Sequence, residues 1–415
     1  MKSRFEVRRM ECWREWVVPK ALRSRPIHRW YVFPHSFTSR LVHGLIDEWH
    51  LGQADTIIDP FAGAGTTLLA AKEKGVPACG YDISPVAVLA ARVKIANYSK
   101  ERLRCAWQVL QDAIDSGSWG RPARAYPELV NRALPGKLLG AFDSIARQIA
   151  ELSSSRAEKD FFRLALIGIV PKYSRAVASG GWLKWIRQRS NTRSVASTLR
   201  RRVEEMLADL DSVRLPRRAE WRVKMADARQ LPDRASSFSA VITSPPYPNR
   251  HDYTRVFGVE LMLQFLDWEA TRQLRYQSFH SHPEARPQRP CHADYQPPER
   301  LLRITACLKK KGLERKIVGM LEGYFLDMHL CLREIERVCR PEARIALVLG
   351  NAQYRGVTIP VDELTAEIAE NAGLGCDRLL AVRYRGNSAQ QMGKFGRRPS
   401  RETIVLLNKP SAASS

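Results

Sequence analysis

The residue types at positions 243–247, which read Thr-Ser-Pro-Pro-Tyr, suit the binding of a planar ring that carries an amine. The hydroxyl of Ser244 can accept a hydrogen bond, and the prolines have no N–H of their own, so their carbonyls are free to accept from a ligand. Tyr247 adds a flat aromatic face. A slot that accepts hydrogen bonds in one plane and covers a ring fits a base with an exocyclic amine.

The segments on either side of this run place it at one edge of a sheet. The apolar residues Ala240-Val241-Ile242 precede it, and a polar segment from Pro248 to Tyr253 follows it. An apolar run that stops at Pro-Pro predicts a buried parallel strand ending in a rigid loop. Ligands of open α/β sheets bind beyond the carboxyl ends of such strands. Taken alone, however, this run is better explained as a turn that ends a strand.

A second group of residues suggests a nucleoside site. Residues 56–67 read as a strand, a Gly-rich turn and the start of a helix, and the apolar segment 78–83 contains Asp82 near its end. Glycines let a ligand approach the backbone, and the helix N-terminus offers free N–H groups. An acid at the tip of the next strand is placed to bind two ribose hydroxyls. No Gly-Lys-Ser/Thr follows, so the turn is not a P-loop.

The net charge of the 415-residue chain is +24, from 67 Lys and Arg against 43 Asp and Glu. Such an excess favours a polyanionic partner, most simply nucleic acid, although a generally basic protein would show it too. Cys79 and Cys376 lie beside apolar runs, and the chain starts without an apolar leader. We therefore expect reduced thiols, a cytoplasmic location and no membrane segment.

Two regions interrupt the α/β pattern. Residues 96–216 are mostly helical in pattern, with a break at Gly180–Trp185 and then a basic stretch, Arg187–Arg202, which predicts either a nucleic-acid surface or a solvated helix face. Residues 270–316 are polar, basic and Pro-rich, which predicts a long loop or a small inserted module. The spacing of the potential metal ligands in that segment matches no common zinc site, and we expect no metal. These ligands are His280, His282, Cys291 and His292.

The two motifs resemble those of DNA amino-methyltransferases that use S-adenosylmethionine. Residues 59–66, Asp-Pro-Phe-Ala-Gly-Ala-Gly-Thr, resemble the cofactor motif, and residues 243–247 resemble the catalytic motif. The Ser-Pro-Pro-Tyr form is typical of N4-cytosine enzymes, whereas N6-adenine enzymes more often have Asp or Asn in place of the Ser. The resemblance runs from about Phe33 to Leu407, apart from the two inserted regions.

The resemblance also implies roles for individual residues. It implies a catalytic set of Ser244, Pro245, Pro246 and Tyr247. It implies a cofactor-binding set of Phe37, Asp59, Pro60, Phe61, Ala62, Gly63, Gly65, Thr66, Thr67, Asp82, Ile83, Asp227 and Ala228. For DNA we expect contacts from Arg250 and Tyr253, and from Lys394, Arg397 and Arg398 in the basic, Gly-rich segment Gly386–Arg401.

The implied fold is an α/β, Rossmann-like class I methyltransferase whose seven-stranded, mostly parallel sheet has one antiparallel strand. The apolar runs agree, with strands expected near residues 57, 80, 223, 241, 346, 381 and 405. The last two are expected to pair at the sheet edge. The catalytic domain would comprise residues 31–95 and 217–410, and either residues 96–216 or residues 270–316 would hold the target-recognition region.

The implied activity is site-specific methylation of the N4 amine of cytosine in double-stranded DNA. A cognate restriction endonuclease is a further partner to test. Three alternatives remain open: an N6-adenine DNA methyltransferase, an RNA base amino-methyltransferase, and a non-catalytic scaffold that binds nucleic acid.

Overall fold

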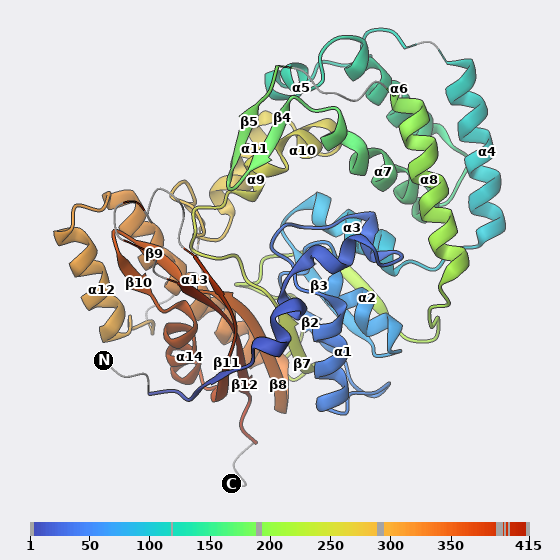
Figure 1. Cartoon of the computed structure of the whole chain (residues 1–415). Helices are drawn as coiled ribbons and strands as arrows, with labels where there is room; N and C mark the ends of the chain where they lie inside the picture. Colours follow the sequence, from blue (N-terminus) through green and yellow to red (C-terminus); the bar gives the residue numbers. More distant parts are fainter. Residues whose placement is uncertain are drawn as a thin grey trace.

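The computed structural model describes residues 4–117, 119–187, 193–288, 294–386, 393, 396 and 399–411. An eight-stranded sheet forms the centre of the molecule (Figure 1), in the order β1-β11-β12-β8-β7-β2-β3-β6. The strands are β1 Val7–Arg9, β2 Ile57–Asp59, β3 Ala78–Asp82, β6 Trp221–Met225, β7 Phe238–Thr243, β8 Cys339–Gly350, β11 Gly375–Arg385 and β12 Ser400–Asn408.

Strand directions agree with the expected sheet. β12 is antiparallel to both of its neighbours, and every other neighbouring pair is parallel. The seven strands from β6 to β11 confirm the predicted α/β fold with one antiparallel strand. The expectation that β11 and β12 end the sheet is wrong, because the N-terminal strand β1 pairs with β11 and forms the edge.

The sheet is buried on both faces, as parallel strands require. Successive side chains alternate: Ala240 and Ile242 of β7 pack on one face, and Val241 between them packs on the other. One face is covered by α1 (Ser39–Glu48), α2 (Thr66–Glu73) and α3 (Pro85–Ile95), and the other by α13 (Arg315–Val338) and α14 (Val361–Asn371). The central strands are therefore held from both sides, and their carboxyl ends are fixed in space.

A helical insertion packs on α3, on the side of that helix that faces away from the sheet (Figure 1). Apolar residues from several of its helices, among them Leu103, Phe142 and Phe162, form a buried core. Its elements are α4 Lys100–Ser116, α5 Glu128–Ala133, α6 Lys137–Glu151, α7 Arg156–Ile169, the hairpin of β4 Ala176–Ser179 and β5 Trp182–Trp185, and α8 Val195–Ser212.

The basic stretch that ends at Arg202 has a partly structural explanation. Arg200 of α8 binds the carboxylate of Asp115 on α4, and Arg202 donates to the carbonyl oxygen of Trp30. These two arginines join elements of the protein and do not form a free basic surface.

Most of the remaining elements follow the loop at residues 244–252, which contains most of the predicted catalytic motif and is called the catalytic loop below. In the segment 270–316, the described residues at both ends are largely helical. These elements are α9 Tyr253–Val256, α10 Gly258–Gln264, α11 Trp268–Gln277, α12 Glu299–Lys310, the hairpin of β9 Ala352–Tyr354 and β10 Val357–Ile359, and 3-10 helices at Glu11–Val17, Pro19–Arg23, His28–Trp30 and Val170–Lys172. Across the described ranges, no helix is long and apolar enough to cross a membrane.

Candidate active site

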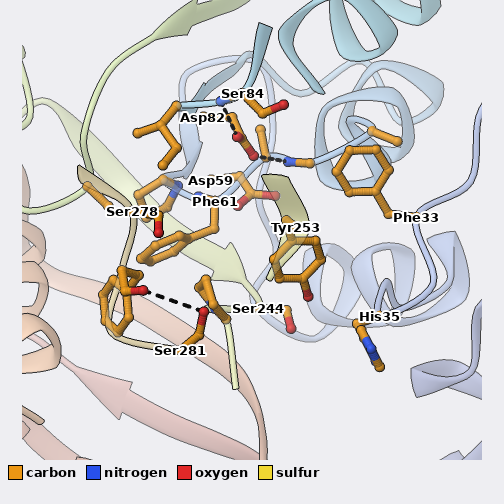
Figure 2. A pocket seen from close by; sticks show the side chains of 18 of the residues that line it. Phe33, His35, Asp59, Phe61, Asp82, Ser84, Ser244, Tyr253, Ser278 and Ser281 are labelled. Carbon is orange, nitrogen blue, oxygen red and sulfur yellow. Dashed lines mark hydrogen bonds between the residues drawn. The ribbon is translucent and has the colours of Figure 1, made fainter. Parts of the chain in front are cut away.

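A cavity lies at the carboxyl ends of β2, β3 and β7 (Figure 2). Asp59 and Asp82, the last residues of β2 and β3, line it, as does Ser244, which follows β7. The cavity brings together most of the residues predicted to bind cofactor and substrate. Those that line it are Phe37, Asp59, Pro60, Phe61, Ala62, Gly63, Thr66, Asp82, Ile83, Asp227, Ala228, Ser244, Pro246 and Tyr253.

Asp82 is held in place by the backbone of two turns. One carboxylate oxygen accepts from the N–H of Gly63 at 2.9 Å, and the other accepts from the N–H of Ser84 at 2.8 Å (Figure 2). Each oxygen keeps a further lone pair for a ligand. Burial raises the pKa of Asp82 to about 6, while these hydrogen bonds act in the opposite direction. The carboxylate is thus a rigid pair of acceptors above this pH.

Asp59 is a second buried acid in the same cavity. Its carboxylate accepts from the hydroxyl of Thr243 at 2.6 Å and from the N–H of Phe61 at 3.1 Å. Burial raises its pKa to about 6, with the hydrogen bond from Thr243 opposing that rise. The Thr243 contact joins the cofactor motif to the catalytic motif through a single hydrogen bond.

Two residues assigned to the cofactor do not line the cavity. Gly65 has φ +77°, and a Cβ there would lie 2.7 Å from Cβ of Ala91, so this glycine permits the close packing of α2 on α3. Thr67 is fully buried and donates from its hydroxyl to the carbonyl of Ile242. Both residues hold the cofactor motif in place through packing and a hydrogen bond, and neither lines the cavity.

The hydroxyl of Ser244 donates to the carbonyl of Val348 on β8, at 3.2 Å. A serine hydroxyl has one hydrogen to donate and two lone pairs to accept with. Because its hydrogen is directed to Val348, the oxygen is left as an acceptor in the cavity that it lines. Such an arrangement suits a ligand amine, which donates.

The side chain of Tyr247 is buried and only 8% exposed. Its hydroxyl is 3.3 Å from a carboxylate oxygen of Glu402, and its ring packs so tightly on Gly350 that a Cβ there would be 2.8 Å from the ring. Tyr247 and Pro245 are not among the residues that line the cavity. The stacking of Tyr247 on a base stays a prediction.

The residues expected to contact DNA fall in different places. Arg250 is exposed, but Tyr253 is part of the cavity wall, and its ring packs 4.6 Å from that of His251. Burial raises the pKa of Tyr253. Tyr253 therefore belongs to the cavity wall, and its contact with DNA stays a prediction. Lys394, Arg397 and Arg398 lie outside the described residues.

Sequence reasoning missed the segment 278–282, which covers one side of the cavity with Ser278, Phe279, Ser281 and His282. The carbonyl of Ser281 accepts from the N–H of Arg250 at 2.8 Å, so this segment also supports the catalytic loop. Its polar, Pro-rich surroundings predict a loop and carry no signal of contact with residues thirty positions earlier.

Arg229 is a second site residue that the sequence did not reveal. It is buried and donates two hydrogen bonds to the carboxylate of Asp227. Its Nη1 also lies 3.2 Å from a carboxylate oxygen of the fully buried Asp327 of α13. Asp327 also accepts from the backbone and the ring of His280. His280 is thereby explained as part of an ion network. Within the described residues no three metal ligands cluster, and Cys291 and His292 fall outside them.

The acceptors and apolar walls of the cavity fit a nucleoside cofactor that carries positive charge. Asp82 presents two acceptors, which match adjacent ribose hydroxyls. Apolar walls stand on either side, with Phe61 and Phe279 in edge-to-face contact at 5.7 Å and Phe33 stacked on Phe257 at 4.6 Å. Asp59 adds a second acid. Fold and site together define a class I methyltransferase with S-adenosylmethionine as its cofactor.

Comparisons with known proteins refine that class. A family model described as N6_N4_Mtase, DNA methylase, matches residues 8–92. Type II methyltransferase M.BsoBI of Geobacillus stearothermophilus is 29% identical across 96% of this chain and 88% of its own length. Type II methyltransferase M.AvaI of Nostoc sp. (strain PCC 7120) is 27% identical across 94% of this chain and 88% of its own length. The N-terminal part of the chain thus matches the model of the N6/N4 DNA methylases, and nearly the whole chain is similar to type II methyltransferases.

Among solved structures, a SAM-dependent methyltransferase from Methanosarcina mazei aligns with 88% of this chain and 98% of its own. The identity is 10% and the TM-score 0.31, values too low to relate the two folds in detail. The strand order and the motifs therefore define the fold class.

Proposed function

We propose that this protein transfers a methyl group from S-adenosylmethionine to the N4 amine of cytosine in double-stranded DNA, at a specific sequence. The observation that carries this proposal is Ser244, whose hydroxyl donates to Val348 and keeps its lone pairs for a substrate amine. A short, neutral acceptor stands here where N6-adenine enzymes more often have Asp or Asn.

The cytosine amine needs activation because its lone pair is delocalised into the ring. Two acceptors, the hydroxyl oxygen of Ser244 and the carbonyl of Pro245, would each take a hydrogen bond from the amine and draw the nitrogen toward tetrahedral geometry. The lone pair is then localised on nitrogen and forms the new bond to carbon.

The bound cofactor supplies a methyl group on a positively charged sulfur, and the electron pair of the broken bond stays with that sulfur. The methylated nitrogen then loses one proton to solvent. Because that nitrogen becomes acidic only after methylation, no strong base is needed beforehand. Asp82 and Asp59 hold the cofactor side and the catalytic loop holds the base, so positioning supplies much of the rate.

The base must leave the duplex to reach this cavity, since its amine is inaccessible within the stack. Tyr247 would cover the ring of the extruded base. The net charge of +24 supplies affinity for the phosphate backbone, and binding should weaken as salt rises.

The test is incubation of the protein with unmethylated plasmid and labelled S-adenosylmethionine, followed by mass spectrometry of the nucleosides. We expect N4-methylcytosine, and we expect none with Ser244→Ala. Only N6-methyladenine would overturn the base assignment and keep the activity. Labelled RNA in a parallel reaction, with no labelled DNA, would point to an RNA enzyme, and no product on either would favour the scaffold.

We further propose that the methylation protects DNA from a restriction endonuclease that recognises the same site, as the similarity to type II methyltransferases suggests. Plasmid recovered from cells that express the protein can be challenged with a panel of endonucleases. Resistance to one of them reveals the recognition site, whereas full sensitivity to all would contradict a protective role on the sites that they cleave.

A further inference from the structure

The hairpin β4–β5 of the helical insertion has two unlike faces. Cross-strand pairing joins Ala176 to Trp185 and Ala178 to Leu183, and it joins Ser179 to Trp182. Because side chains alternate along a strand, Leu183 and Ala176 share the face that packs on the helices of the insertion. Trp182 and Lys184 share the opposite face, and both are exposed.

The outer face is aromatic and basic. Trp182 is 57% exposed, and the guanidinium of Arg255 lies 4.8 Å from the centre of its ring. Trp185 pairs with Ala176 and therefore lies on the other face, at the end of the hairpin, where it is 39% exposed with the guanidinium of Arg132 4.4 Å from the centre of its ring. Burial of a tryptophan stabilises a fold, yet here the chain leaves two of them at the surface with cations beside them.

The hairpin turn rests directly on the catalytic loop. A Cβ on Gly181 would lie 2.8 Å from the carbonyl oxygen of Arg250 and 2.9 Å from Cα of His251, so only glycine fits here without movement. Helix α9 continues this connection, since its Tyr253 lines the cavity and its Arg255 covers Trp182. The hairpin thus lies beside α9 (Figure 1), and both the catalytic loop that it touches and α9 border the cavity that would receive an extruded base.

We propose that β4–β5 enters the major groove of the target duplex beside the extruded base, with Trp182 and Lys184 directed at the DNA. A two-stranded ribbon has the size that the major groove admits, whereas the minor groove is too narrow for it. Lys184 meets a phosphate in this arrangement, and Trp182 makes apolar contact with base edges. This inference rests on the proposed DNA methylation and goes beyond it by naming the element that contacts the duplex.

The experiment compares Trp182→Ala and Lys184→Ala with controls at exposed positions outside the hairpin, Val109→Ala on α4 and Lys310→Ala on α12. Binding to a plasmid fragment that the wild type methylates is measured across salt concentrations, and cofactor affinity is measured by calorimetry. We expect Trp182→Ala to weaken DNA binding at least tenfold. Lys184→Ala should lower the salt slope by about 1. Both variants should bind cofactor normally, and the controls should match the wild type.

The groove is tested with the same fragment made with a bulky group on C5 of its thymines, which projects into the major groove. We expect this group to weaken binding of the wild type more than binding of Trp182→Ala. An equal effect on the two proteins would contradict the major-groove placement.

Failure of this inference is distinguishable from failure of the proposed function. If wild-type protein methylates the plasmid and the hairpin variants keep wild-type DNA affinity and salt slope, the hairpin does not contact DNA. If Trp182→Ala instead changes only self-association of the protein, the tryptophans form a protein interface and the inference is overturned. Absence of methylated nucleosides with wild type would refute the activity itself.

Discussion

The two ends of the cavity are built in different ways. At the cofactor end, Asp82 is held by the backbone N–H groups of Gly63 and Ser84, all within one strand-turn-helix-strand unit. At the proposed target end, Ser244 is hydrogen-bonded to Val348, which is 104 positions away, and Tyr247 to Glu402, 155 positions away. The cofactor end is a local structure, and the target end is assembled by the whole fold.

This difference suggests that the two ends can be disturbed separately. A change at the cofactor end should alter cofactor affinity alone, because its contacts lie within that unit. A change at the target end should alter methyl transfer and leave cofactor binding intact. The hydrogen bond from Thr243 to Asp59 is the direct contact between the two ends described above.

The largest effect is expected from Ser244→Ala. It removes one acceptor for the amine and no bulk, and loss of one such preorganised hydrogen-bonding group costs roughly 100-fold or more in rate. Single-turnover transfer should fall accordingly, with DNA and cofactor affinity unchanged. Ser237→Ala, at an exposed position just before β7, is the control and should be fully active. Equal loss of cofactor affinity in Ser244→Ala would show that the two ends are not separable.

A smaller effect is expected from Asp82→Asn. The amide keeps one acceptor oxygen and replaces the other with a donor, which faces either a backbone N–H or a ribose hydroxyl. Hydrogen bonds to charged groups are worth about 1.5–3 kcal/mol, so cofactor affinity should fall roughly 10- to 100-fold by calorimetry. Asp82→Ala should lose at least as much. The exposed Asp112→Asn on α4 is the control, and unchanged affinity in Asp82→Asn would remove this residue from the site.

Cofactor binding should depend on pH because both acids are buried. Burial raises the pKa of Asp82 and of Asp59 to about 6; only the carboxylate form of Asp82 offers two acceptors to ribose hydroxyls, and only the carboxylate form of Asp59 offers negative charge to the cofactor. Binding therefore favours proton release, and affinity should be constant well above pH 6 and fall below it, by about tenfold per pH unit for each proton released. Calorimetry between pH 5 and pH 8 measures this, and Asp82→Asn should show a shallower fall. A flat profile would mean that both acids stay ionised throughout.

The smallest effect is expected from Tyr247→Phe. It keeps the ring and removes only the hydroxyl that lies 3.3 Å from Glu402, which is worth about 1 kcal/mol of folding stability. Transfer should change only a few-fold. Tyr247→Ala should lose transfer and weaken capture of the extruded base, because stacking contributes about 1–3 kcal/mol per base. If Phe and Ala variants were equally impaired, the hydroxyl rather than the ring would be the functional part.

Elements whose signal is local were predictable. The apolar run Ala240–Ile242 before two prolines is a strand that ends at the site, and the turn at residues 59–66 joins a strand to a helix as expected. The antiparallel pairing of β11 and β12 also follows from two apolar runs. Periodicity and turn residues carry this information, since both act between neighbours in the chain.

Contacts between distant segments were not predictable. The pairing of β1 with β11, the packing of residues 278–282 on the cavity and the place of Tyr253 in its wall all join segments with no shared pattern. The ion pair of Arg229 with Asp327 is another such contact, because no pattern in the neighbouring sequence predicts it. A polar residue in a polar segment is consistent with exposure or with a buried ion pair.

The sequence by itself determined which chemical groups are available: the acceptors at residues 243–247, the acids at the strand tips and the glycine turn, all encoded within short runs. Only the tertiary structure decided how those groups are oriented. Ser244 presents its lone pairs to the cavity because β8 places the carbonyl of Val348 to take its hydrogen, and the hairpin reaches the catalytic loop because Gly181 has no side chain to keep them apart. Such directions are set by backbone atoms of remote strands, and a linear pattern of side chains does not encode them.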